Sequence, residues 1–319
     1  MTLRMLWLRP FATATPQKAE IYLKDLGKAW IGELYKIRRF FMSIKKIWAV
    51  YFSPTGNVSM VVNQIAKKIA SKLEKPCECI DFTLPESRNG VYSFTEEDLV
   101  VFGVPTYAGR IPNKLLPFVQ SGFSGNGALL LPVALYGNRS AGDTLMELRN
   151  ELGERGFRSI AAASITGSHV FSDKIAPGRP DERDMQEIAE FAERVAENVK
   201  NLSSEPGIVL PDGNDPVGPY YTPLGIDGNP AKFLKAKPLT DAEKCVRCGL
   251  CATVCPMGSI DADEPAAVNG VCIKCQACIK KCPAGAKYFE DEAFLSHVAY
   301  LEKNFTGRKE NKFYFADKL

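Results

Sequence analysis

Two cysteine runs with identical spacing lie close together near the end of the chain. The first reads Cys-x-x-Cys-x-x-Cys-x-x-x-Cys-Pro over residues 245–256, and the second repeats it over residues 272–283. A structural zinc site needs four ligands, whereas each run offers three closely spaced cysteines and one before a proline. Disulfides would require an oxidising compartment, which nothing else in the chain suggests. The double pattern therefore favours a larger metal–sulfur group in each half.

This spacing is similar to that of the bacterial ferredoxins that hold two [4Fe–4S] clusters, in which the fourth cysteine of each run ligates the cluster of the other run. Three thiolates on a tight turn can each reach one iron of the cubane, and its fourth iron needs a ligand from elsewhere. The resemblance implies one cluster on Cys245, Cys248, Cys251 and Cys282, and a second on Cys272, Cys275, Cys278 and Cys255.

Composition limits the class of protein. The 319 residues are 45% hydrophobic and 24% charged, as in an ordinary soluble globular protein of about two domains. A net charge of +3 gives no support for nucleic acid as a partner. The longest apolar run, residues 128–135, is too short to cross a bilayer, so we expect no integral membrane segment. Thiols and oxygen-sensitive clusters together predict a cytoplasmic location.

The first 45 residues differ from the rest of the chain. Residues 1–46 carry ten Lys and Arg against three Asp and Glu, and apolar residues from Leu23 to Phe41 recur at helical spacing. One interpretation is a targeting or membrane-surface segment. The other, which we favour, is that translation begins at Met42. Residues 1–45 are accordingly treated as a basic N-terminal extension.

Residues 46–202 alternate between apolar strand patterns and amphipathic helix patterns, which predicts a parallel sheet built from βαβ units. The expected strands are residues 47–52, 77–82, 99–104, 128–135 and 159–166. Most of them end in a polar turn that contains glycine. Because ligands of open parallel sheets bind beyond the carboxyl ends of the strands, we expect a ligand site at these turns.

The turn after the first expected strand, Ser53-Pro54-Thr55-Gly56-Asn57, has the features of a phosphate site. Hydroxyl, amide and backbone N–H groups can surround a phosphate there, at the start of a helix. The P-loop alternative fails because no Gly-Lys-Ser/Thr follows the glycine. A receiver-type domain would need an acidic cluster at the strand ends, which the sequence lacks. A plain turn with a capped helix is the remaining alternative.

On this loop and the strand pattern, residues 46–202 resemble the flavodoxin family. The resemblance implies a five-stranded, parallel, doubly wound α/β sheet with strand order 2-1-3-4-5 and a bound FMN. Val58 replaces a threonine that many flavodoxins have after the asparagine, so only its backbone N–H can contribute. The family's loops after the third and fourth strands embrace the flavin ring. Here the implied FMN-binding residues are Ser53, Pro54, Thr55, Gly56, Asn57, Val58, Thr106, Tyr107, Ala108, Gly109, Tyr136, Gly137, Asn138 and Arg139.

The remaining segments follow from composition and pattern. Residues 203–240 are rich in Pro, Gly and Asp and are expected to be a linker. Residues 241–290 form the small α+β two-cluster ferredoxin domain, and residues 291–319 a C-terminal helix and tail. The complete arrangement resembles the flavodoxin–ferredoxin fusion proteins of anaerobic bacteria and archaea.

Three functions are compatible with this organisation. The leading hypothesis is an electron carrier that passes electrons between two [4Fe–4S] clusters and FMN, and on to a redox partner protein. Five basic residues flank the cluster ligands and suit an acidic partner: Lys244, Arg247, Lys274, Lys280 and Lys281. The alternative is an FMN-dependent iron–sulfur reductase acting on a small acceptor. A redox sensor is third, because no DNA-reading segment is recognisable. We assign no catalytic residue, although His169 is expected near the flavin.

Overall fold

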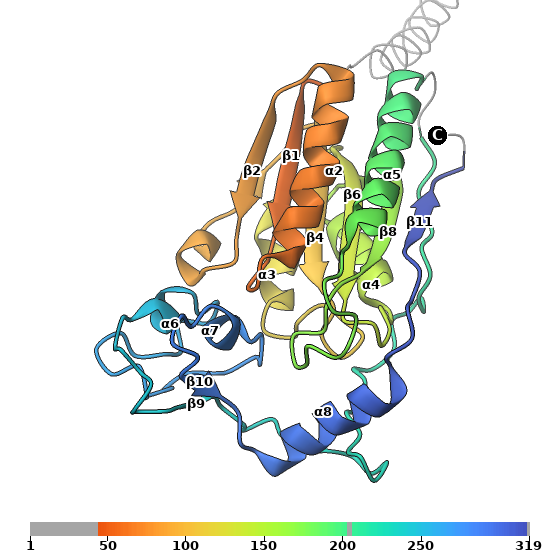
Figure 1. Cartoon of the computed structure of the whole chain (residues 1–319). Coiled ribbons are helices and arrows are strands. Elements are labelled where there is room, and N and C mark those ends of the chain that lie inside the picture. The colour runs from red at the N-terminus through yellow and green to blue at the C-terminus, as the bar shows by residue number, and fades with distance from the viewer. Residues whose placement is uncertain (1–43, 203–205, 318–319) are drawn as a thin grey trace, which may run out of the picture. The chain divides into compact units, whose positions relative to one another are not determined.

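The computed structural model describes residues 44–202 and 206–317, which belong to one compact unit (Figure 1). The basic N-terminal extension, residues 1–45, lies almost entirely outside the described residues, so both interpretations of it stay predictions. Within the described residues, no helix combines the length and the apolar character that a membrane crossing requires.

Five parallel strands form the centre of the main sheet. They are β1 (Lys46–Tyr51), β2 (Cys77–Asp81), β4 (Asp98–Pro105), β6 (Leu129–Tyr136) and β8 (Ala161–Thr166). Their order across the sheet is β2-β1-β4-β6-β8, with parallel pairing throughout. This order is the predicted 2-1-3-4-5 arrangement. The central strand β6 is buried at every position, as expected for a sheet covered on both faces.

The sheet is larger than the five strands predicted. The two-residue strand β7 (Arg158–Ser159) pairs with β6, and β11 (Lys312–Phe315) joins the edge strand β8 in antiparallel orientation. Figure 1 shows that β11, which is close to the C-terminus, lies beside β8 at this edge of the sheet. Its Lys-Phe-Tyr-Phe sequence favours a strand. Its pairing with β8, which is distant in the chain, cannot be read from this short sequence. Outside this sheet, β3 (Tyr92–Ser93) pairs with β5 (Phe123–Ser124).

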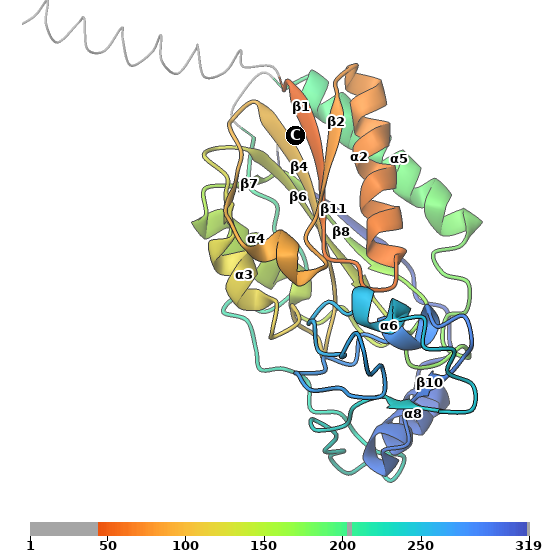
Figure 2. The same cartoon turned by 90° about the vertical axis from the view of Figure 1, so that its left-hand side faces the viewer.

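Helices cover both faces of the sheet (Figure 2). One face packs against α2 (Asn57–Leu73) and α5 (Glu182–Lys200), and the other against α3 (Leu116–Ser121) and α4 (Thr144–Glu154). Buried apolar side chains on α2, from Val58 to Ala70, recur every three or four residues, which explains why this face of the helix packs on the sheet. Asp181 caps α5, because its carboxylate accepts a hydrogen bond from the N–H of Asp184.

The cysteine-rich region has little regular structure. It contains the antiparallel pair β9 (Leu239–Thr240) and β10 (Lys287–Tyr288) and the four-residue helices α6 (Leu250–Thr253) and α7 (Ala277–Lys280). The helix α8 (Glu292–Asn304) follows, with Asp291 as its predicted N-cap. Phe294 and Leu301 are buried on α8 as expected, together with His297.

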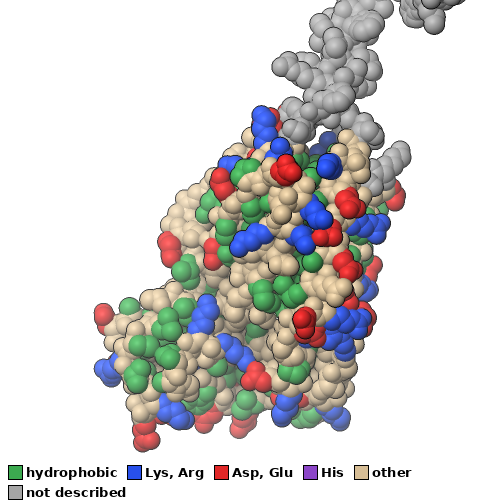
Figure 3. All heavy atoms as spheres, turned by 45° about the horizontal axis from the view of Figure 1, so that its top comes forward, with side chains coloured by type: hydrophobic (Ala, Val, Ile, Leu, Met, Phe, Trp, Pro, Cys, Tyr) green, Lys and Arg blue, Asp and Glu red, His purple; other side chains and the backbone are tan. Residues whose placement is uncertain are grey.

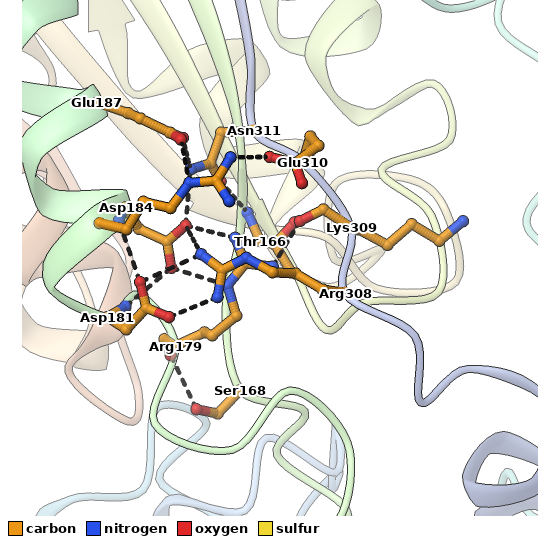
Figure 4. A network of polar contacts seen from close by, with 11 residues as sticks. Thr166, Ser168, Arg179, Asp181, Asp184, Glu187, Arg308, Lys309, Glu310 and Asn311 are labelled. Carbon is orange, nitrogen blue, oxygen red and sulfur yellow. Dashed lines mark hydrogen bonds and ion pairs between the residues drawn. The ribbon is translucent and has the colours of Figure 1, made fainter.

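A buried polar network attaches the segment after α8 to the α/β domain (Figure 4). The guanidinium group of Arg179 is 5% exposed and pairs with Asp184, which is fully buried. Arg308 also reaches Asp184, at 3.1 Å, and Asn311 donates to the same carboxylate at 2.9 Å. The side chain of Asn311 accepts from the N–H of Thr166 at the end of β8. This network fixes the chain where it enters β11.

Candidate cofactor sites

The two cysteine runs fold into the same local shape. In the first run Arg247 and Gly249 have φ values of 51° and 72°, and in the second Lys274 and Gln276 have 56° and 64°. These left-handed residues stand at matching positions on either side of the second cysteine. A helix then starts in each run, α6 or α7. The equal spacing therefore gives both runs the same backbone turn. In each run, this turn places three cysteines around one cavity.

The structure arranges the eight cysteines around two cavities, and each cavity combines both runs. The first cysteine site is lined by Cys245, Cys248, Cys251 and Cys282. The second cysteine site is lined by Cys255, Cys272, Cys275 and Cys278. Among the described residues, these cysteines included, no three His, Cys, Asp or Glu side chains converge closely enough to bind a single metal ion. The cysteines instead surround a space, and four thiolates around a space fit a cubane cluster.

Backbone N–H groups point at several of these sulfur atoms. Ser259 donates to Sγ of Cys255 at 3.4 Å, and Ala286 donates to Sγ of Cys282 at 3.3 Å, again at matching positions. Such bonds stabilise negative charge on sulfur. At the second site, burial raises the pKa of the Cys275 thiol to about 12. A thiolate at this position therefore needs the positive charge of bound iron.

The loop between β1 and α2 has the geometry of a phosphate cradle. Gly56 has a φ of +98° and ends the turn immediately before the first helical residue, Asn57. Oγ of Ser53 accepts from the N–H of Ser59 at 2.9 Å, which holds the loop against the helix. The N–H groups of Asn57 and Val58 have no acceptor among the described residues. Free donors at a helix N-terminus fit a phosphate group.

Thr83 belongs to this cradle and was not predicted from the sequence. Its hydroxyl accepts from the N–H of Ser53 at 2.8 Å, and its own N–H donates to Asp81 at 2.9 Å. Thr83 follows β2, which lies beside β1. Because turns after neighbouring parallel strands lie at the same sheet edge, this position would have been a reasonable candidate.

The loop after β4 is a tight turn. Tyr107 and Arg110 exchange backbone hydrogen bonds of 2.9 and 3.1 Å, and the two residues between them, Ala108 and Gly109, have positive φ values. Thr106 precedes the turn, and its hydroxyl is buried without a partner among the described residues. Burial raises the pKa of the Tyr107 phenol well above its usual value, and the charges of Cys275 and Cys272 raise it further.

In the loop after β6, Asn138 is bound by the C-terminal segment. Asn138 is fully buried, and its amide donates to the carbonyl groups of Phe305 and Gly307 at 2.7 and 2.9 Å. The Tyr136 side chain is buried as well. The partners of Asn138 are distant in the chain, so the local sequence pattern could not predict them.

The other two residues of this loop contact neighbouring loops. A Cβ atom at Gly137 would lie 2.5 Å from the imidazole ring of His169, so the ring can pack here only against glycine. The guanidinium group of Arg139 lies 3.9 Å from the ring centre of Tyr221. His169 is half-buried at this place, and burial lowers its pKa to about 4, with the charges of His297 and Arg139 acting in the same direction.

The segment expected to be a linker is fixed to the α/β domain. The carboxylate of Asp143 accepts from the N–H groups of Asn214 and Gly218 at 2.9 and 2.8 Å. Farther along, Tyr221 donates its N–H to the carbonyl of Ala108 at 2.8 Å. Asp143 was not predicted, because a single acidic residue in a loop gives no local signal of a partner 71 residues away.

Comparison with known proteins agrees with the motifs. A 4Fe–4S binding domain model matches residues 238–261, and a second 4Fe–4S binding domain model matches residues 269–285. No curated protein matches the chain. A flavodoxin from the domain Archaea is 20% identical over 49% of this chain and 99% of that chain, with a TM-score of 0.34.

Two further solved structures are similar at the same level. Flavodoxin 2 from Bacillus cereus is 17% identical over 48% of this chain and 98% of that chain, with a TM-score of 0.35. The rubredoxin oxygen:oxidoreductase of Desulfovibrio gigas is 14% identical over 50% of this chain and 37% of that chain, also with a TM-score of 0.35. The strand order and parallel pairing of the sheet, rather than these scores, define the fold.

Proposed function

From a chain that joins a flavodoxin-like α/β sheet to two 4Fe–4S binding motifs, we propose an electron carrier that passes electrons between two [4Fe–4S] clusters, an FMN and an external redox protein. Each cluster exchanges one electron and FMN one or two, and a single chain keeps the three groups at high effective concentration. The residues of the chain bind these groups and set the distances between them.

The cluster ligands are assigned as the sequence predicts. Cys245, Cys248, Cys251 and Cys282 hold one cluster, and Cys272, Cys275, Cys278 and Cys255 hold the other. Support comes from the two cavities, each of which is lined by three cysteines of one run and the fourth cysteine of the other. Cys77 and Cys79 lie on β2 and take no part.

The FMN phosphate is assigned to the cradle at the start of α2. Backbone N–H groups of Asn57 and Val58 bind it, and Gly56 and Ser53 shape the loop, as their conformation and hydrogen bonds support. Thr106, Tyr107, Ala108 and Gly109 border the flavin ring. From the loop after β6 we retain Tyr136, Gly137 and Arg139 as neighbours of the ring, but not the side-chain amide of Asn138, which donates to the carbonyl of Phe305 in the C-terminal segment.

The observation that carries this proposal is the packing of the α/β domain against the second cysteine site. Ile273, which lies between Cys272 and Cys275, packs against a buried core that includes Phe52, the residue before Ser53 of the loop assigned to the FMN phosphate. Arg88, on the turn after β2, donates to the carbonyl of Pro256, the residue after Cys255. A carrier needs this kind of closeness between its redox groups.

Anaerobic purification with analysis of iron, sulfide and FMN tests the proposal. We expect about eight irons per chain, as two cubane clusters require, together with one FMN. Replacement of Cys282 by serine should remove iron, whereas the matched variant Cys79→Ser, at an exposed cysteine of β2, should keep the full amount. Electrons from the reduced protein should pass to redox proteins. A protein without FMN, or steady turnover of a small acceptor, would contradict the carrier.

A further inference from the structure

We infer that the two clusters hold different places in the electron path. The second cysteine site exchanges electrons with the FMN, and the first cysteine site exchanges them with the external redox protein. This inference rests on the proposed function and adds an order to it. It follows from a comparison of the two cysteine runs, which have the same spacing and the same backbone turns but different surroundings.

Matching positions of the two runs differ sharply in exposure. The second cysteine of the first run, Cys248, is exposed, whereas its counterpart Cys275 is only 8% exposed. Val246 is 69% exposed, whereas its counterpart Ile273 packs against a buried core of the α/β domain. The cysteine motif cannot cause this difference, because it is the same in both runs. The difference arises from what covers each run.

The contacts from the α/β domain lie at the second cysteine site, which combines the second run with Cys255 of the first. The packing of Ile273 against the core of the domain is one of them. On the 3₁₀ turn after β2 (Pro85–Arg88), Arg88 donates to the carbonyl of Pro256, the residue after Cys255. Cys255, Cys272 and Cys275 all line the second cysteine site.

Two further contacts lie close to the same site. A Cβ atom at Gly258 would be 3.5 Å from Pro85, and Lys280, two residues after Cys278, pairs with Asp173 in the loop after β8. The second cysteine site therefore lies against the carboxyl ends of the strands, the edge of the sheet at which the turns assigned to FMN also lie.

The first cysteine site faces solvent. Val246 and Leu250, which line its cavity, are 69% and 38% exposed, and the Arg247 side chain is 72% exposed. Figure 3 shows hydrophobic side chains gathered on the lobe at its lower left, with Lys and Arg side chains beside them. An external protein can approach Cys248 directly, whereas Cys275 lies beneath the surface.

The electron count is consistent with this order. Reduction starts with one electron that passes from an external one-electron donor, which is oxidised, to the first site. The electron then passes to the second site, so that the first is oxidised again. Two such passages supply the two electrons that reduce FMN completely, and the accompanying protons come from solvent. The same path serves in reverse when an external acceptor is reduced.

Two matched variants test the order, because each removes the second cysteine of one run. In Cys248→Ser the second site keeps its four cysteines, and in Cys275→Ser the first site keeps them. Iron and FMN are quantified first. A protein without FMN would refute the proposed function, and this result is then distinguished from a failure of the order alone. After flash reduction, we expect Cys248→Ser to retain the fast reduction of FMN and Cys275→Ser to lose it. The opposite pattern would overturn the order.

A second measurement uses the unmodified protein and needs no cluster to be removed. A soluble dysprosium chelate shortens the electron spin relaxation of paramagnetic centres that it can approach. We expect the chelate to act strongly on one reduced cluster and weakly on the other, and the cluster that remains in Cys275→Ser to be the strongly affected one. Equal effects on both clusters, or a stronger effect on the one that remains in Cys248→Ser, would contradict the inference. This measurement tests the difference in exposure between the two clusters even in a protein that lacks FMN.

Discussion

Among single residues, Gly56 gives the sharpest test of the phosphate cradle. Its φ of +98° strains any other residue, although no atom lies within 4 Å of an added Cβ. We therefore expect Gly56→Ala to destabilise the protein by about 1–2 kcal/mol, the usual cost of a left-handed backbone, and to weaken FMN binding. Gly153→Ala is the control, since that glycine lies in α4 with open space around it. It should stabilise the protein slightly. Urea unfolding and FMN titration measure both effects, and unchanged FMN affinity in Gly56→Ala would contradict the cradle.

His169 gives a prediction about pH at the same scale. Burial lowers its pKa to about 4, below the value of about 6.5 for an unfolded histidine. The unfolded chain therefore binds more protons between these values, and this residue lowers stability as the pH falls from about 6.5 toward 4. We expect the thermal midpoint to drop less between pH 7 and pH 5 in His169→Gln than in the unmodified protein. Equal drops would show that His169 is not half-buried as described.

At the scale of elements, β11 tests whether the end of the chain is part of the sheet. Phe313 stacks on Phe191 of α5, with ring centres 4.9 Å apart, and is half-buried. We expect Phe313→Ala to lower the free energy of unfolding by about 2 kcal/mol, the value of a buried aromatic contact. On the same strand, Lys312 makes an exposed ion pair with Asp212, so Lys312→Ala should cost less than about 1 kcal/mol. Urea unfolding compares them, and equal losses would argue against a packed β11.

The polar network between α5 and the C-terminal segment gives the second prediction for an element. Asp184→Asn would leave the buried guanidinium group of Arg179 without its charge partner, which we expect to cost about 3 kcal/mol. Arg183→Ala changes only exposed pairs with Glu187 and Glu310, and should cost less than about 1 kcal/mol. The midpoints of urea unfolding separate the two variants. A small effect of Asp184→Asn would mean that the network does not hold this segment.

For the whole molecule, local patterns in the sequence were sufficient for the cysteine runs and for the positions of the parallel strands, because each depends on residues that are close in the chain. The order of the strands followed from the resemblance to flavodoxins, and the phosphate cradle at Gly56 stays a prediction. Contacts between distant residues were not predicted. Examples are the pairing of β11 with β8, the hydrogen bond that Asn138 donates to Phe305, and the one that Gly218 donates to Asp143. The asymmetry between Cys248 and Cys275 is of the same kind, because it depends on packing against the α/β domain.

The central claim is that one chain passes electrons between its own clusters and its own FMN. The most direct measurement is the rate of FMN reduction after the clusters are reduced by a flash, followed anaerobically over a wide range of protein concentration. The account predicts a fast rate that does not change with concentration, because the donor and acceptor are parts of the same molecule. A rate proportional to protein concentration would show that the electrons pass between molecules and would contradict the account.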